Sequence, residues 1–297
     1  GSAGGVGQAI IKSLNISDLP LTIITSDIDE NNAGYFRGDE FLKLPKVENI
    51  ENLNPIIEIF NKNKIDIFLI GSEHELFFFS INKKIIEDKT QTIVAVSPKQ
   101  VIEVSNDKYL TAQFLKKNNI SVSSFWVPKN LGEAKKIFLN YGKPIILKSR
   151  EGTSSKNVFV IENINQLKDK FHMVDKPFIQ ELLSRPTSDL KDEYTCSIFK
   201  CSNGKLIGPF TSKRTIKNGD SWKIEVDDFK FLKKILMKIG KLLPFEGSLN
   251  VQLMMTKNGP IPFEFNSRFS GTTAIRAHFG FNEPEMVIES FYLRKKL

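Results

Sequence analysis

Short apolar segments alternate with amphipathic ones along the first hundred residues of this chain. Strands are predicted at 21–26, 65–71 and 92–96, with helices near 54–62 and from Glu73 onward. Strands that alternate with helices form βαβ units, in which neighbouring strands run parallel. We therefore expect the N-terminal third to be an α/β domain built on a parallel sheet.

A glycine-rich turn opens the chain and leads into a predicted helix. Gly1, Gly4 and Gly7 would suit dinucleotide binding, with Asp27 or Asp29 as the acid that binds a ribose. Their spacing departs from G-x-G-x-x-G, and glycines also permit a tight turn packed against a strand. On these residues alone both interpretations stay open. Because the chain begins inside this turn, we expect the first strand of the unit to lie outside the sequence.

The composition changes near residue 105. Ser105 or Asn106 is expected to cap a helix that runs to about Asn118. Further helices are predicted near 131–141 and 227–242, with several strands between them. The second part of the chain therefore combines helices and strands in a different order from the first.

A small, hydroxyl-rich loop at 150–157 separates predicted strands at 143–149 and 158–161. Backbone N–H groups of such a loop can face phosphates, and Lys148 at its base would add a positive charge. Taken alone, a loop of this kind is more often a simple connection between two strands. The loop is therefore a candidate phosphate cover that needs support from other residues.

Near the end of the chain, an Asn258-Gly259 turn is predicted to join two strands into a hairpin. Polar residues recur at every second position of both strands. They are Asn250 and Gln252 on the first strand and Glu264, Asn266 and Arg268 on the second. Side chains alternate between the two faces of a strand, so Phe263 and Phe265 are expected on the opposite face. If the two polar faces coincide, a carboxylate, three amides and a guanidinium converge.

Such a polar face has two interpretations. Oxygen ligands of this kind suit Mg²⁺, which takes one or two carboxylates together with phosphate oxygens. A polar face can also be simply the solvated side of a hairpin, and an isolated E-x-N-x-R pattern does not decide between them.

Composition excludes some classes of protein. The chain has 42 basic and 34 acidic residues, a net charge of +8, but no basic block interleaved with aromatic residues as on a nucleic-acid surface. No apolar run reaches the length of a membrane span, and no signal peptide is recognisable. Cys196 and Cys201 are expected to be packing residues in a reducing compartment. We therefore expect a cytoplasmic protein that binds neither nucleic acid nor membrane.

Together these segments resemble an ATP-grasp ligase, in particular a single synthetase unit of the carbamoyl-phosphate synthase large subunit. The resemblance covers almost the whole chain. It implies a Rossmann-like pre-ATP-grasp α/β domain at 1–104, in which the glycine turn is structural. A two-lobed α+β ATP-grasp domain would follow at 105–297, with a small lobe at about 105–180 and a large lobe at about 181–297.

The resemblance also implies residues that bind the nucleotide. Lys108 and Lys148 fall where the family has basic residues that contact the ATP phosphates. Glu181 and Leu183 lie in the segment between the lobes that holds adenine, and Glu193 matches the acid that binds the ribose. These positions give the expected ATP site.

The hairpin is the most specific match. In the family its residues hold the metal ions and the acyl phosphate. The implied metal ligands are Gln252, Glu264 and Asn266, and the implied catalytic residues are Arg268, Asn250 and Lys217. Three positions depart from the family pattern: Lys217 replaces a histidine, Ser267 replaces a proline, and the loop 150–157 has one glycine instead of several. These departures leave the native substrate open.

The implied activity is an ATP-dependent ligase that activates a carboxylate as an acyl phosphate for attack by an amine or ammonia. ATP and Mg²⁺ or Mn²⁺ are the implied cofactors, small-molecule carboxylates and amines are the implied partners, and the N-terminal domain offers a surface for a homodimer. Two alternatives are an NAD(P)-dependent reductase that uses the glycine turn and a nucleotide-binding protein without turnover. The absence of a recognisable proton donor argues against the reductase, and the complete set at Glu264, Asn266 and Arg268 argues against the protein without turnover.

Overall fold

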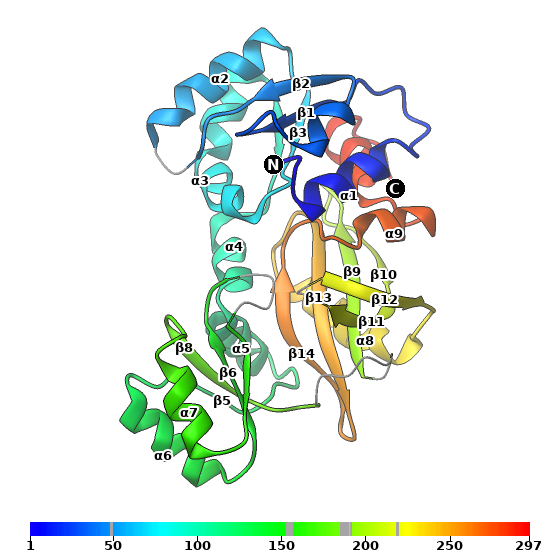
Figure 1. The fold of residues 1–297 in the computed structure, drawn as a ribbon. Coiled ribbons are helices and arrows are strands. Elements are labelled where there is room, and N and C mark those ends of the chain that lie inside the picture. Colours follow the sequence, from blue (N-terminus) through cyan, green and yellow to red (C-terminus); the bar gives the residue numbers. More distant parts are fainter. Residues whose placement is uncertain (48–49, 153–156, 185–189, 191, 218–219) are drawn as a thin grey trace.

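A computed structural model describes the chain except for a few short segments. The described residues are 1–47, 50–152, 157–184, 190, 192–217 and 220–297. Figure 1 shows an α/β part at the top, a small four-stranded sheet at the lower left and a larger sheet at the right. Residues 153–156 of the expected phosphate loop and residues 218–219, next to Lys217, lie outside the described residues.

The N-terminal part contains two pairs of parallel strands. Its elements are α1 (Gly5–Leu14), β1 (Ile24–Asp27), a 3-10 turn (Ala33–Phe36), β2 (Glu40–Lys43), a 3-10 turn (Ile50–Asn52), α2 (Leu53–Lys62), β3 (Ile67–Leu69), α3 (Glu73–Thr90) and β4 (Ile93–Ala95). β1 pairs with β2 and β3 pairs with β4, and both pairs are parallel. The predicted parallel pairing is therefore confirmed, but the four strands form two separate two-stranded sheets, and the Rossmann-like organisation stays a prediction. The chain as a whole is a mixed α/β protein.

The opening turn is closely packed. A Cβ atom on Gly7 would lie only 2.2 Å from the carbonyl oxygen of Gly1, so a larger residue would displace the backbone. The carboxylate of Asp27 accepts hydrogen bonds from the backbone N–H groups of Ala3, at 2.8 Å, and Ile28, at 2.8 Å. Gly7 and Asp27 therefore both stabilise the conformation of the turn.

Two helices, α4 (Lys99–Asn106) and α5 (Lys108–Lys117), lead from the N-terminal part to the small sheet. The cap of α5 is Asp107, which accepts hydrogen bonds from the N–H groups of Tyr109 at 2.8 Å and Leu110 at 3.4 Å. The prediction of Ser105 or Asn106 as cap is wrong, because both residues belong to the last turn of α4. α4 extends across the expected boundary at 104/105, and the division into domains stays a prediction.

The small sheet is antiparallel, with strand order β5-β8-β6-β7. Its elements are β5 (Phe125–Trp126), α6 (Leu131–Tyr141), β6 (Ile145–Ser149), β7 (Phe159–Ile161), α7 (Ile164–Phe171) and β8 (Pro177–Glu181). Ala134 of α6 and Leu167 of α7 pack with Ile145, Leu147 and Ile161 in one apolar cluster. Both helices therefore cover the same face of this sheet.

The large sheet has the order β12-β11-β9-β13-β14, with β10 paired to β9. Its elements are β9 (Glu193–Lys200), β10 (Leu206–Phe210), β11 (Ser212–Lys217), β12 (Asp220–Val226), α8 (Lys230–Leu242), β13 (Gly247–Thr256) and β14 (Gly259–Asn266). Cys196, Val251 and Phe265 pack against Leu232 and Leu236 of α8. Because side chains alternate along strands, the polar residues between them lie on the opposite face.

The chain ends in α9 (Thr273–His278), α10 (Glu283–Val287) and a π-helical turn (Ile288–Tyr292). α9 and α10 pack against α1, and Figure 1 shows both chain ends close to these helices. Cys196 and Cys201 are free and buried, in agreement with the expected packing role. Among the described residues, no helix has both the length and the apolar character needed to cross a lipid bilayer.

Candidate active site

The hairpin of β13 and β14 brings the predicted polar residues together. Asn250 lies opposite Asn266, and Gln252 lies opposite Glu264, in an antiparallel register. The expected coincidence of the two polar faces is therefore confirmed. The turn is shifted by one residue from the predicted Asn258-Gly259, because Lys257 and Asn258 form its tip and Gly259 is already the first residue of β14.

A β-bulge changes the expected position of Phe263. Gln252 pairs with Glu264, but Leu253 pairs with Pro262, so Phe263 is an extra residue in β14. The prediction that Phe263 shares the face of Phe265 is wrong. Phe265 belongs to the core beneath α8, whereas the ring of Phe263 lies 5.8 Å from Nζ of Lys148.

Glu264 lies at the centre of the polar face. Its Oε1 accepts hydrogen bonds from Nε2 of Gln252 at 3.2 Å and from Nδ2 of Asn266 at 3.1 Å. Both amides therefore hold the carboxylate from neighbouring positions in the sheet.

Arg214 of β11 extends this network, although no role was predicted for it. Its Nη2 donates to Oε1 of Gln252 at 2.7 Å, and its Nε donates to Oε1 of Glu193 at 2.8 Å. Lys213, the preceding residue, lies over the ring of Tyr194 instead. Strand alternation could have placed Arg214 and Lys213 on opposite faces, but the sequence gives no sign of which strand lies beside β11.

Arg268 continues the network in the other direction. Its Nη2 donates to Oδ1 of Asn266 at 3.0 Å and to Oε2 of Glu73 at 2.7 Å, and its Nη1 donates to the carbonyl oxygen of Phe269 at 2.8 Å. Glu73 is the first residue of α3, far away in the sequence. An unbroken series of side-chain hydrogen bonds thus links Glu73, through Arg268 and Glu264, to Glu193.

Lysine side chains add positive charge to this face. Burial and, to a smaller extent, the charge of Lys108 lower the pKa of Lys148, whereas the charges of Glu264 and Glu193 oppose this, and the net result is a pKa of about 8. Burial raises the pKa of Glu264, but the charges of Lys108 and Lys148, the bond from Asn266 and the charge of Arg214 together bring it below its usual value. Glu264 is therefore an ionised carboxylate among several cations, an environment suited to a polyanionic ligand.

Lys108 lies at the entrance to the loop that follows β6. Its backbone N–H donates to the carbonyl oxygen of Arg150 at 2.9 Å, and its Nζ donates to that of Gly152 at 3.0 Å. The guanidinium of Arg150 in turn pairs with Asp107. Hydrogen bonds and an ion pair thus hold the start of α5 against the start of the expected phosphate loop.

The donor set fits a metal ion only in part. In the described part of the chain, no group of three or more His, Cys, Asp or Glu side chains is placed to hold one. Glu264 is the single carboxylate of the expected set, while the amide oxygens of Gln252 and Asn266 accept from Arg214 and Arg268. These residues would hold Mg²⁺ together with phosphate oxygens, which supply the charge that the protein lacks.

The other expected site residues lie around this centre. The side chain of Asn250 is buried and accepts a hydrogen bond from Oγ1 of Thr195 at 3.0 Å. Glu181 ends β8 and accepts from the N–H of Ser124 at 3.1 Å, and Leu183 follows two residues later. Lys217 is exposed, with its Nζ 4.3 Å from the centre of the Trp222 ring, and none of its described contacts reaches Glu264.

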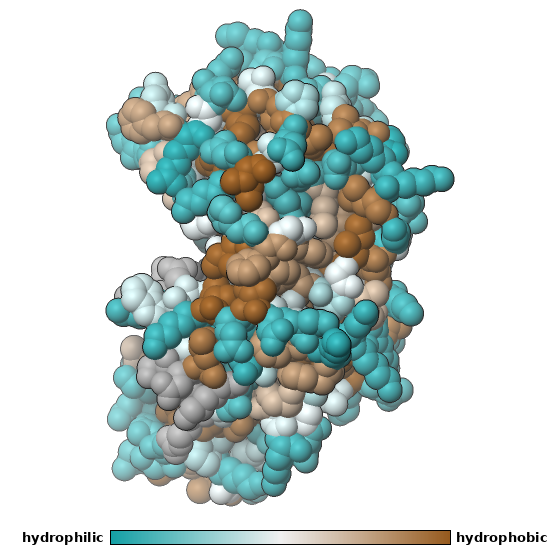
Figure 2. All heavy atoms as spheres, turned by 90° about the vertical axis from the view of Figure 1, so that its right-hand side faces the viewer, coloured by the Kyte–Doolittle hydropathy of each residue, from teal (hydrophilic) through white to brown (hydrophobic). Residues whose placement is uncertain are grey.

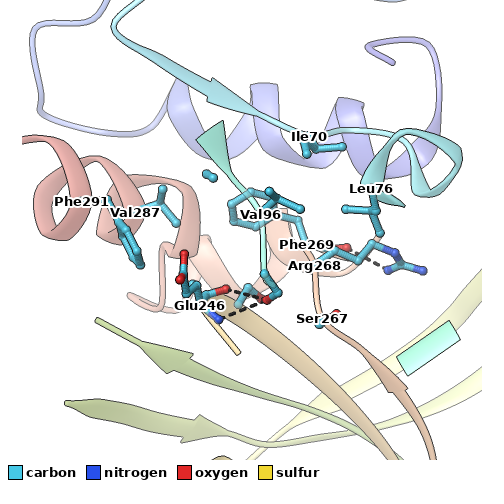
Figure 3. Close-up of a pocket in the computed structure, with 13 residues that line it drawn as sticks. Ile70, Leu76, Val96, Glu246, Ser267, Arg268, Phe269, Val287 and Phe291 are labelled. Carbon is cyan, nitrogen blue, oxygen red and sulfur yellow. Dashed lines mark hydrogen bonds between the residues drawn. The ribbon is translucent and has the colours of Figure 1, made fainter. Parts of the chain in front are cut away.

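A cleft of about 580 Å³ opens beside Arg268. It lies between the start of α3, the end of α4 and the end of β14. Its ionisable lining residues are Glu73, His74, Glu103, Asp107, Glu151 and Arg268. A second, much smaller cavity of about 20 Å³ lies where the N-terminal part meets the large sheet, and Figure 3 shows Arg268 beside it, donating to Phe269. The larger cleft has room for a small substrate next to the guanidinium.

Comparison with known proteins identifies relatives of this chain. A model of the ATP-grasp domain family matches residues 105–272, more than half of the chain. Phosphoribosylamine–glycine ligases from Caldanaerobacter subterraneus subsp. tengcongensis and Pyrococcus horikoshii are each 24% identical, over 90% and 93% of this chain respectively. The chain spans 58–67% of the length of three such relatives.

Solved structures share the fold. The N5-carboxyaminoimidazole synthetase of Staphylococcus aureus, complexed with ADP, has a TM-score of 0.74 at 18% identity. The superposition covers 99% of this chain and 76% of the synthetase chain. The biotin carboxylase of Campylobacter jejuni has a TM-score of 0.76 at 16% identity, and the superposition covers 97% of this chain and 68% of the carboxylase chain. At these identities the likeness concerns the fold alone.

These comparisons do not favour the reductase alternative. The glycine turn that prompted it packs closely against its own backbone, and Asp27 accepts a hydrogen bond from a backbone N–H of the turn. The finer resemblance to carbamoyl-phosphate synthase stays a prediction. The family assignment itself is confirmed, and this chain belongs to the ATP-grasp family.

Proposed function

We propose that this chain uses ATP to activate a small carboxylate as an acyl phosphate, which an amine or ammonia then attacks to form a C–N bond. The observation that carries the proposal is the position of Glu264. It is ionised, held by two amides and surrounded by Lys108, Lys148 and Arg214, with a substrate-sized cleft beside Arg268. Most of the catalytic effect would come from positioning and electrostatics.

The nucleotide would lie between the small and large sheets. Lys108 and Lys148 would bind its phosphates, Glu181 and Leu183 would hold the adenine, and Glu193 would bind the ribose. Glu193 is already oriented by Arg214, which supports a role in binding hydroxyl groups. The loop after β6 begins against Lys108, where it could approach the phosphates.

Glu264 would hold Mg²⁺ or Mn²⁺ with help from Gln252 and Asn266. The bound ion would neutralise charge on the phosphate oxygens. Arg268 would bind the carboxylate and stabilise the charge that develops when the amine displaces phosphate, a task suited to a planar guanidinium. Asn250 and Lys217 are proposed to assist near the acyl phosphate.

The names of the relatives suggest substrates to try first. The curated relatives are ligases of phosphoribosylamine and glycine, and a structural neighbour, the 2-oxoglutarate carboxylase domain of Hydrogenobacter thermophilus, contains MgADP and bicarbonate. Glycine and bicarbonate are therefore the first carboxyl-containing probes. That neighbour is also a dimer, and Figure 2 shows an apolar patch at mid-height of one face of this protein, which would suit a homodimer.

A thermal-shift screen tests the nucleotide part of the proposal. ATP, ADP, NADH and NADPH are each added with and without Mg²⁺, because a ligand that binds only the native state raises the melting temperature. We expect stabilisation by ATP and ADP that increases with Mg²⁺. Stabilisation by a nicotinamide cofactor alone would overturn the proposal in favour of the reductase.

Phosphate release from Mg·ATP then tests turnover. Glycine, bicarbonate and a panel of other small carboxylates are supplied with ammonia or an amine, and Glu264→Gln is the inactive control. Exposed Glu225 of β12 offers a matched control, since Glu225→Gln removes the same charge outside the site. Nucleotide binding without carboxylate-dependent phosphate release across the panel would favour a nucleotide-binding protein without turnover.

A further inference from the structure

We propose that Glu73 of α3 is a positioning residue that fixes the guanidinium of Arg268 for catalysis. The inference rests on the proposed function, because it assigns Arg268 to the reacting carboxylate. It adds a residue from the N-terminal α/β part to a site that otherwise comes from the small and large sheets and the start of α5.

The contact is short and lies at the edge of the cleft. Oε2 of Glu73 is 2.7 Å from Nη2 of Arg268, and the two side chains are 23% and 14% exposed. Both line the cleft of about 580 Å³ beside Asn266. A pair this shielded from solvent has a more defined geometry than an exposed surface pair.

The donors of Arg268 explain why one carboxylate has a large effect. Arginine has five N–H donors in a fixed plane. Glu73 and Asn266 accept from Nη2, and Phe269 accepts from Nη1. Two donors remain: Nε–H is buried and makes no hydrogen bond among the described residues, and the second Nη1 donor lies in a plane that the bonds to Phe269 and Glu73 fix. The second Nη1 donor can therefore meet a substrate oxygen at a constant position.

α3 supplies a rigid base for this contact. The helix is 18 residues long, and Leu76, Phe79 and Ile86 are buried in the N-terminal core. Glu73 is its first residue, so its backbone moves with the helix. A rigid support of this kind is what precise placement of a catalytic group requires.

Two variants separate geometry from charge. Glu73→Ala removes the contact, whereas Glu73→Gln loses the charge but keeps an oxygen that can accept from Nη2. Glu103→Ala is the matched control, since Glu103 lines the same cleft but pairs with Lys99 on its own helix. Melting temperatures of all three are measured first, so that folding defects are recognised.

The first measurement needs no substrate. The Nε–H signal of Arg268 in a ¹⁵N–¹H spectrum is identified by its loss in Arg268→Lys, and its exchange with solvent is followed. Nε is buried in the native structure. We expect exchange to become about tenfold faster in Glu73→Ala and to stay unchanged in Glu103→Ala. Unchanged exchange in Glu73→Ala would overturn the positioning role.

The second measurement is phosphate release with Mg·ATP and glycine or bicarbonate as probes. We expect Glu73→Ala to lower kcat about tenfold or more with little change in the KM for ATP, and Glu73→Gln to recover most of the loss. A lower KM for the carboxylate with undiminished kcat would contradict positioning, because Glu73 would then be a competitor for Arg268. Absence of turnover in the wild type counts against the proposed function, while the exchange measurement still decides the role of Glu73.

Discussion

Arg214 and Gln252 meet across the large sheet, with Nη2 of the arginine 2.7 Å from Oε1 of the glutamine. The same guanidinium holds Glu193 at 2.8 Å. One side chain therefore connects the proposed ribose-binding acid with a proposed metal ligand. Because Gln252 in turn donates to Glu264, a change at Arg214 should affect both ends of the nucleotide site.

We predict that Arg214→Met weakens Mg·ATP binding by about tenfold or more, because Glu193 and Gln252 lose a shared charged donor worth roughly 1.5–3 kcal/mol. Isothermal titration with Mg·ATP measures the effect. Lys223→Met on the neighbouring strand removes an exposed charge and should leave the affinity unchanged. Equal affinities for wild type and Arg214→Met would show that this network does not support the nucleotide.

For Glu264, we predict that substitution by Gln abolishes Mg²⁺-dependent ATP turnover while the fold is retained. The variant keeps the shape of the side chain but removes the single carboxylate of the expected metal set. For the same reason, Mg²⁺ should bind the wild type weakly until nucleotide supplies phosphate oxygens. Titrating Mg²⁺ with and without ADP tests this point, and tight binding of two ions to the nucleotide-free protein would refute it.

Lys148 should make nucleotide binding depend on pH. Burial, followed by the charge of Lys108, lowers its pKa to about 8, so the side chain is protonated below pH 8 and loses its charge above it. Phosphates favour the protonated form, and the affinity for Mg·ATP should therefore fall as pH rises, by up to about tenfold per unit above 8. Lys148→Arg keeps its charge and should show a flat profile. A wild-type affinity that is constant from pH 7 to 9.5 would contradict a direct role for Lys148.

The polar face of the hairpin could be predicted from sequence because side-chain alternation in a strand is a local property. Asn250, Gln252, Glu264 and Asn266 lie together as expected. Phe263 does not follow the pattern, since a bulge depends on the register against the partner strand and not on the residue itself. The cap of α5 was missed for a different reason: Ser105, Asn106 and Asp107 are adjacent and all three types can cap a helix.

Long-range contacts explain the other omissions. Glu73 and Arg268 are 195 positions apart, and Arg214 and Gln252 are 38 apart, so no local spacing connects them. The short parallel strand β2 (Glu40–Lys43) and helix α7 (Ile164–Phe171) were also not predicted. β2 is only four residues long and has no fully buried residue. In α7, Ile164, Leu167 and Phe171 do share one apolar face, but the helix has only eight residues, too few turns for the periodicity to stand out in the sequence.

The last prediction concerns a buried ion pair that joins the C-terminal helices to the large sheet. Nε of Arg276 is 2.6 Å from Oε2 of Glu283, and the two side chains are 2% and 0% exposed. The other carboxylate oxygen of Glu283 accepts from the hydroxyl groups of Ser197 on β9 and Ser248 on β13. The same two strands carry proposed site residues within a few positions of these serines, so the buried ion pair also supports the site.

Glu283→Gln should destabilise the fold by roughly 3–5 kcal/mol, because it leaves the guanidinium of Arg276 buried without its counter-charge. Denaturant unfolding measures this difference. Glu289→Gln removes the partner of half-exposed Lys295 and should cost less than about 1 kcal/mol. Pairing Glu283→Leu with Arg276→Met should restore part of the stability lost in either single variant, since no unpaired charge is then left in the interior. Equal effects of Glu283→Gln and Glu289→Gln would mean that the buried pair contributes no more than a surface one.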